Sequence, residues 1–138
     1  RTEFPNSYFD AVSCISVIEH GVDIQLYFRE MSRIIKPNGF LITSTDYWPD
    51  HIDTRGMETF DAPWRISDRG DIRGAIETAE SCGFELDGKI ELDARERTVT
   101  WNRREYTFIY FALRNAKDSG LSSAQPGSRK MDTRLSTD

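Results

Sequence analysis

The chain has 138 residues and a net charge of −5, so it has no basic field that would attract a phosphate backbone, and we expect no nucleic acid as its main partner. A hydrophobic content of 38% is enough for one modest core. The sequence contains no run of about 18 apolar residues and no signal-like apolar start, so we expect a cytoplasmic protein with no membrane partner.

A strand, a helix and a second strand are predicted in order between residues 8 and 46. Residues 9–18 form an apolar run rich in β-branched side chains, which is typical of a strand buried on both faces. Asp23 can cap a helix that Pro37 ends, and residues 40–45 are predicted to form the next strand. The helix carries apolar residues on one face, namely Ile24, Tyr27, Phe28, Met31, Ile34 and Ile35. A right-handed crossover then makes the two strands parallel and brings their carboxyl ends to one edge.

Polar and aromatic side chains follow both predicted strands at that edge. Glu19 and His20 come after the first strand, and Asp46, Tyr47 and Trp48 come after the second. Open α/β sheets bind their ligands outside the carboxyl ends of the strands. We therefore expect the chemistry of this chain at this rim.

The remaining elements are predicted from turn signals and periodicity. They are, in chain order, a loop over residues 47–64 that is a candidate lid, a helix from Ser67 or Asp68 to Gly83, an outer strand over residues 89–93, a charged hairpin-like stretch over 95–105 and a central strand over 106–113. From residue 114 onward the composition is polar, and we expect a disordered tail over 114–138. Cys14 and Cys82 are expected to be reduced and buried.

The phrase FDAVSCISVIEH followed by FREMSRIIKPNGFLITSTD resembles the fourth and fifth strand segments of class I S-adenosylmethionine-dependent methyltransferases, closest to the small-molecule or type 11 group. An FDxV strand, an EH pair and an LKPGG-like turn occur in the order and spacing of the family. The resemblance covers Phe4 to about Asp46 and continues more loosely to Leu113. Asn38 stands where the family usually has glycine, and asparagine also tolerates a left-handed turn position.

The resemblance implies an α/β fold, a Rossmann-like methyltransferase three-layer sandwich that is truncated and has a mixed sheet with an antiparallel last strand. Residues 1–113 would be the C-terminal half of such a domain, because the chain contains no GxG loop. By the same resemblance, the four predicted strands should be ordered first, second, last, third, and both helices should cover one face. We expect this chain alone to bind S-adenosylmethionine weakly or not at all.

The resemblance also implies S-adenosylmethionine as the cofactor and assigns roles to residues at the rim. Ser16, Val17, Ile18 and Glu19 would contact the cofactor. His20 is the best-placed general base, and the alternative is a loop residue that only caps the strand.

The lid supplies the other predicted site residues. Asp46 and His51 are candidates for catalytic contact with the acceptor. The rings expected to wall an acceptor pocket are those of Tyr47, Trp48, Phe60 and Trp64, and the alternative is that they only pin the loop to the sheet. No spacing typical of a metal site is present.

Three functions remain open on the sequence. The first is a methyltransferase that acts on a small-molecule acceptor and that we expect not to be competent without an N-terminal cofactor-binding half. The second is a non-catalytic half-domain that serves as an interaction module, with a homodimer formed through the exposed sheet edge at residues 9–18. The third is a nucleotide-binding or nucleic-acid-binding α/β domain, which the lack of a phosphate loop or basic face disfavours.

Overall fold

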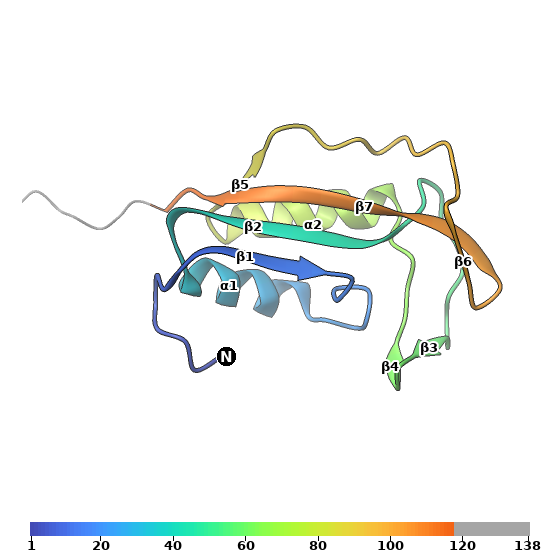
Figure 1. Cartoon of the computed structure of the whole chain (residues 1–138), viewed down its shortest axis with the longest axis horizontal. Coiled ribbons are helices and arrows are strands. Elements are labelled where there is room, and N and C mark those ends of the chain that lie inside the picture. Colours follow the sequence, from blue (N-terminus) through green and yellow to red (C-terminus); the bar gives the residue numbers. More distant parts are fainter. Residues whose placement is uncertain (118–138) are drawn as a thin grey trace, which may run out of the picture.

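A computed structural model of the chain describes residues 1–117, which form a five-stranded mixed sheet, a two-stranded hairpin and two helices (Figure 1). The strands of the main sheet are β1 (Phe9–Ile15), β2 (Ile35–Tyr47), β5 (Phe84–Asp87), β6 (Val99–Trp101) and β7 (Arg104–Asn115). Their order is β1-β2-β7-β5, and β6 pairs with the start of β7. The β1–β2 pair is parallel and the others are antiparallel. The mixed sheet and the antiparallel last strand are therefore confirmed, and the order agrees with the prediction except that the outer strand is β5 and not residues 89–93.

Helix α1 (Ile24–Ile34) begins where the sequence predicts, because the side chain of Asp23 accepts a hydrogen bond from the Leu26 amide at 2.9 Å. Strand β2 follows without a separate loop, since Ile35 is already extended and pairs with Phe9. The predicted Pro-Asn-Gly turn is a bulge inside this strand, with Asn38 at a φ of 62°.

Helix α2 (Arg69–Ser81) begins with a capping box. The Asp68 carboxylate accepts from the Asp71 amide at 3.0 Å, and the Asp71 carboxylate accepts from the Asp68 amide at 3.1 Å. The helix ends at Cys82 and Gly83, whose φ of 93° takes the left-handed position that favours glycine. Both predicted ends of this helix are confirmed.

Both helices pack on the same face of the sheet. Figure 1 shows α2 behind β2 and β7, and α1 below β1. The shared core contains Phe28, Ile34, Ile35, Leu41, Tyr47, Ile72, Ala75, Ala79, Cys82, Phe84, Ile109, Phe111 and Leu113. On the opposite face, which we call the open face, the exposed large apolar side chains are Ile15, Phe40, Ile42, Phe108 and Tyr110. The expectation that both helices cover one face is confirmed for the described residues.

The predicted end of the first strand and the predicted third strand are wrong. The first strand ends at Ile15 and not at Ile18, because Ser16 has a φ of 52° and a turn follows. The predicted outer strand over residues 89–93 is not a strand, and the outer strand is β5. The alternation in that segment has another cause, since Ile90 and Leu92 pack on the core without pairing to the sheet.

The segment after β2 is not loop throughout, because it contains a short hairpin of β3 (Glu58–Thr59) and β4 (Ala62–Pro63). Its turn is made by Phe60 and Asp61, both with positive φ. The predicted charged hairpin is present as β6 and β7. In Figure 1 both hairpins lie at the end of the sheet where β1 and β2 finish.

The last strand ends later than the predicted boundary of residue 113, because β7 continues to Asn115. The side-chain amide of Asn115 is buried and donates to the Ile35 carbonyl at 2.9 Å. The predicted tail lies almost wholly outside the described residues. No helix within residues 1–117 is long and apolar enough to cross a membrane.

Candidate functional site

A cavity of about 280 Å³ lies at the carboxyl ends of β1 and β2. The sheet, the turn after β1 and the two hairpins all contribute to its wall. The lining residues are Ser16, Glu19, His20, Asp46, Thr59, Phe60, Trp64, Trp101, Tyr106 and Phe108. The cavity therefore lies at the rim where sequence reasoning expected the chemistry.

Glu19 is a buried acid at the floor of this cavity. Its side chain is 2% exposed and accepts a hydrogen bond from the Thr45 hydroxyl at 3.2 Å. Burial raises the pKa of Glu19, and the charge of the neighbouring Asp46 carboxyl acts in the same direction. Glu19 therefore takes up a proton more readily than an exposed glutamate.

Asp46 is the second buried acid and is 5% exposed. The Trp64 indole Nε1–H donates to its Oδ2 at 2.8 Å. Burial raises the pKa of Asp46, and the hydrogen bonds from Trp64 and Tyr106 oppose that shift. The same burial raises the pKa of the Tyr106 hydroxyl, so this group remains a hydrogen-bond donor at neutral pH.

His20 brings an unused nitrogen to the cavity. Its backbone amide donates to the Val17 carbonyl at 3.0 Å, which fixes the turn after β1. Its ring nitrogen Nδ1 is buried and has no hydrogen-bond partner among the described residues. Buried polar atoms are normally paired, so an unpaired imidazole nitrogen beside a cavity indicates a partner that is a ligand.

Five aromatic rings complete the wall of the cavity. Trp64 and Tyr106 meet edge to face with centroids 5.8 Å apart, and Tyr106 and Phe108 do so at 6.1 Å. The Phe60 ring meets the His20 ring at 6.2 Å. Two carboxyl groups and several ring faces favour a ligand that is apolar overall and positively charged at one point.

The structure brings together six of the predicted site residues, Ser16, Glu19, His20, Asp46, Phe60 and Trp64. Their roles remain predictions. Val17 is exposed at the turn and does not line the cavity, and Ile18 is buried on the side toward α2, where it lines a different cavity.

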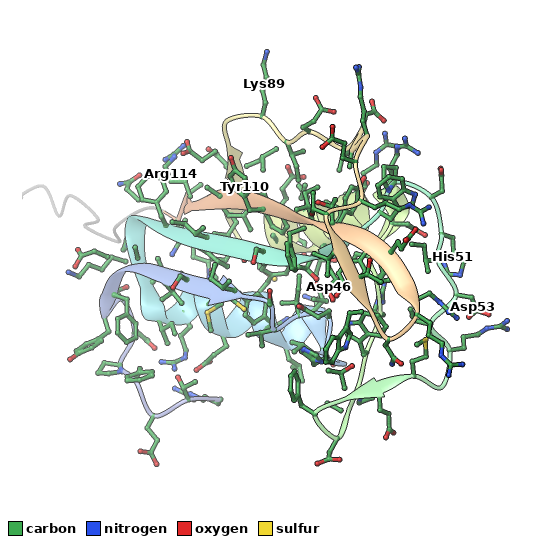
Figure 2. All side chains as sticks on the ribbon, turned by 45° about the vertical axis from the view of Figure 1, so that its right-hand side comes forward. Asp46, His51, Asp53, Lys89, Tyr110 and Arg114 are labelled. Carbon is green, nitrogen blue, oxygen red and sulfur yellow. The ribbon has the colours of Figure 1, made fainter. Side chains whose placement is uncertain are left out.

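His51 lies away from this site. Its side chain lines a separate cavity of about 520 Å³, and its Nδ1 is 3.5 Å from Oδ2 of Asp68. Figure 2 shows His51 and Asp53 on an outer segment, apart from Asp46 at the centre of the molecule. We therefore leave His51 out of the candidate catalytic group.

Two predicted acceptor-wall rings also lie elsewhere. Tyr47 points into the helix-side core, where its hydroxyl donates to the Leu92 carbonyl at 2.6 Å. The reason is strand alternation, which sends adjacent Asp46 and Tyr47 to opposite faces. The Trp48 ring carries the Arg97 guanidinium 4.3 Å from its centroid and packs with Trp64 in a second core.

Sequence reasoning missed the residues that the hairpins supply, Thr59, Trp101, Tyr106 and Phe108. The signal for two of them was present in the alternation of β7, because residues 106 and 108 share a parity. What the sequence did not provide was the register that places Phe108 opposite Asp46. No group of three or more histidine, cysteine, aspartate or glutamate residues within the described part of the chain is arranged to hold a metal ion.

Comparisons with known proteins agree with the geometry. Residues 1–43 match the family model described as a methyltransferase domain. Over 110 residues the chain is 29% identical to the sterol 24-C-methyltransferase of Aspergillus fumigatus, an alignment that covers 73% of this chain and 28% of the relative. The chain thus spans less than a third of the length of that relative.

Solved structures show the same fold. An S-adenosylmethionine-dependent methyltransferase from Methanosarcina mazei superposes with a TM-score of 0.59 at 12% identity, covering 86% of this chain and 64% of that one. The geranyl diphosphate C-methyltransferase from Streptomyces coelicolor A3(2), solved with Mg²⁺, geranyl diphosphate and S-adenosyl-L-homocysteine, superposes with a TM-score of 0.56 at 18% identity. That match covers 83% of this chain and 50% of the other.

Proposed function

We propose that this chain is part of a class I S-adenosylmethionine-dependent methyltransferase and that its rim cavity serves methyl transfer from S-adenosylmethionine to a small-molecule acceptor. The match of residues 1–43 to the methyltransferase-domain model and the shared fold support this proposal. One observation carries the proposal. Glu19, His20 and Asp46 come from two strand ends and a turn, yet they converge on one cavity walled by aromatic rings. We further propose that the protein acts in the cytoplasm, which suits its two unpaired buried thiols.

The residues of the cavity fit the cofactor by their chemistry. When bound, S-adenosylmethionine supplies a methyl group on a positively charged sulfonium. The buried carboxyl groups of Glu19 and Asp46 and the ring faces around them favour positive charge. The unpaired His20 Nδ1 adds a polar contact that the described protein atoms leave unused. Ser16 and Glu19 are the predicted cofactor-binding residues that line the cavity.

His20 is proposed as the general base. Its Nδ1 would accept the proton that the acceptor gives up once the new bond to the methyl carbon has formed. The turn hydrogen bond to Val17 and the edge contact with Phe60 hold the ring at the cavity wall. Glu19 and Asp46 can then balance the positive charge of the imidazolium without leaving their buried positions.

The acceptor is proposed to be an apolar molecule that is methylated at carbon. The Aspergillus fumigatus relative is a sterol 24-C-methyltransferase, and the Streptomyces coelicolor structure is a geranyl diphosphate C-methyltransferase. The cavity of this chain supports the same class, because five of its ten lining residues are aromatic. An alkene carbon that bonds to the methyl group, as the bond from the methyl group to sulfur breaks, leaves a positive charge on the neighbouring carbon. The two buried carboxyl groups would stabilise that charge until a C–H proton passes to His20 and a double bond forms again.

The test is transfer of a labelled methyl group from S-adenosylmethionine by the full chain supplied with an N-terminal methyltransferase half that carries a GxG loop, with prenyl alcohols and unsaturated sterols as acceptors. We expect His20→Ala to lower kcat by a factor of about 10² to 10⁴ and to change cofactor affinity much less. His51→Ala removes the other histidine of the sequence, which lines a different cavity, and should lower kcat less than threefold. A loss of cofactor affinity equal to the loss in kcat would remove His20 from the base role.

A second function is favoured by the open face, on which five large apolar side chains are exposed. The domain would then be a non-catalytic interaction module that pairs with another chain through this face or through the free edge of β1. Methyl transfer by the full chain with a His20-dependent rate would exclude it as the sole function.

A further inference from the structure

The turn of the β3–β4 hairpin is built from unusual residues. Phe60 and Asp61 both have positive φ, 55° and 61°, which is the geometry of a two-residue turn that asparagine and glycine normally make. A bulky side chain in the left-handed region is uncommon, and such strain tends to persist where function needs the side chain. Burial of the Phe60 ring does not offset this backbone strain, since the residue is 86% exposed.

The position of Phe60 gives a reason for keeping the ring. It meets the imidazole of His20 edge to face at 6.2 Å, so it stands over the proposed general base. Trp101, at the end of β6, is 51% exposed and lines the same cavity from the other hairpin. Two exposed rings from two hairpins therefore flank the proposed catalytic cavity.

A second cavity of about 480 Å³ lies outside the first and is lined by Glu58, Thr59, Phe60, Trp101 and Asn102. Three of these residues, Thr59, Phe60 and Trp101, also line the inner cavity. The two cavities therefore meet at the pair of rings. The inner cavity is lined by His20 and the two buried acids. The polar side chains of the outer cavity are those of Glu58, Thr59 and Asn102.

We propose that Phe60 and Trp101 select the acceptor, by gripping the non-reacting part of a long apolar molecule that spans both cavities. The reacting end lies by His20, and the remote end reaches the outer cavity, where the Glu58 carboxylate and the Asn102 amide can pair with a hydroxyl group. This inference rests on the proposed function and adds to it a preference for long acceptors, since an acceptor that fills only the inner cavity contacts the rings from one side and a longer one contacts them from both cavities.

The first experiment measures binding without catalysis. Calorimetric titration of the full chain with farnesol, a three-isoprene alcohol, and with 3-methylbut-2-en-1-ol, a one-isoprene alcohol, should show much tighter binding of farnesol. Phe60→Asn and Trp101→Ala should each weaken farnesol binding on the order of tenfold, the effect of losing one aromatic contact with an apolar ligand. Both variants should weaken the binding of the short alcohol by a smaller factor than that of farnesol. Tyr110→Ala on the open face is the matched control and should leave both affinities unchanged.

A stability measurement separates this role from a structural one. Asparagine is well suited to the left-handed turn position, so Phe60→Asn should leave the melting temperature equal or higher while farnesol binding falls. A ring kept only for packing would instead lower the melting temperature when removed. That result, or farnesol affinity unchanged in both variants, would overturn the proposal.

The outcomes also separate this inference from the proposed function. Ring-dependent farnesol binding without any methyl transfer would leave the long-ligand site standing and reject the transfer reaction. The preference for long over short acceptors is the ratio of their kcat/KM values. If methyl transfer occurs and this ratio is the same in the wild type and in Phe60→Asn, the long-ligand site is rejected and the transfer reaction is not.

Discussion

Adjacent residues of one strand point to opposite faces of the sheet, and the two faces differ in burial and in role. Phe111 and Tyr110 are neighbours in β7, yet Phe111 is 3% exposed under the helices and Tyr110 is 77% exposed on the open face. Figure 2 shows Tyr110 on β7, away from the segment that carries His51. The helix-side face carries the core, whereas the open face is left without a cover over most of its length.

The candidate site lies on the open side of the sheet, at the one end where other segments cover it. Asp46 and Phe108 pair across β2 and β7 and share the parity of exposed Ile42 and Tyr110. Asp46 is nevertheless buried, because Trp64 covers it and donates to its carboxylate. Strand positions of the same parity therefore form an exposed apolar surface at one end of the sheet and the wall of a cavity at the other.

The largest difference between the faces should appear in stability. Phe111→Ala removes a buried ring and should lower the free energy of unfolding by about 3 to 5 kcal/mol. Tyr110→Ala is the adjacent control and should change it by no more than about 0.5 kcal/mol. Urea denaturation followed by circular dichroism measures both, and equal losses would show that the open face is packed in solution.

The next effect concerns the covered end of the open face. Trp64→Phe keeps a ring but removes the donor to Asp46, which leaves a buried carboxyl short of a partner and should cost about 1 to 3 kcal/mol. Trp101→Phe, on an exposed ring for which the structure shows no indole hydrogen bond within residues 1–117, is the control and should cost much less. Recovery of stability in Trp64→Phe combined with Asp46→Leu would identify the unpaired acid as the cause.

Self-association should depend on the uncovered part of the open face, where large apolar side chains are exposed. We expect the chain to dimerise or aggregate at protein concentrations on the order of tens of micromolar, because exposed edges and apolar patches pair. Ile42→Lys should raise the dissociation constant at least about tenfold in sedimentation experiments. Glu77→Lys introduces the same residue on the exposed side of α2 and should leave association nearly unchanged. A clean monomer for the wild type would contradict this expectation.

The smallest effect is a dependence of stability on pH that arises from the two buried carboxyl groups of the site. Burial raises the pKa values of Glu19 and Asp46 above their ordinary values of 4.5 and 3.8. The folded state then holds more protons than the unfolded state as the pH rises through this range, so these two groups make stability fall with increasing pH. Glu19→Gln with Asp46→Asn should flatten that fall between about pH 4 and 7. Thermal unfolding at several pH values would show this, and an unchanged slope would mean that neither acid has a raised pKa.

The β1–α1–β2 unit could be predicted from the sequence almost entirely because its signals are local. Asp23 caps the helix within three residues, and the apolar face of α1 repeats with the helical period. The exact end of β1 and the bulge at Asn38 could not be predicted, since both depend on how the strands pair. Residues 89–93 show the limit of periodicity, because alternation there reflects packing on the core and not pairing in the sheet.

The sequence by itself determined the β1–α1–β2 unit, the apolar faces of both helices and the rim at which Glu19, His20 and Asp46 lie. Phe60 and Trp64 were also predicted, but only the tertiary structure decided that these rings, and not Tyr47 and Trp48, join the site. Tyr47 was the nearest ring in the chain and lies in the core, whereas Phe60, Trp101 and Tyr106 arrive from two hairpins. The physical reason is that helix caps and periodicity act over a few residues, but a cavity wall depends on strand register and on hairpins that fold back over the sheet.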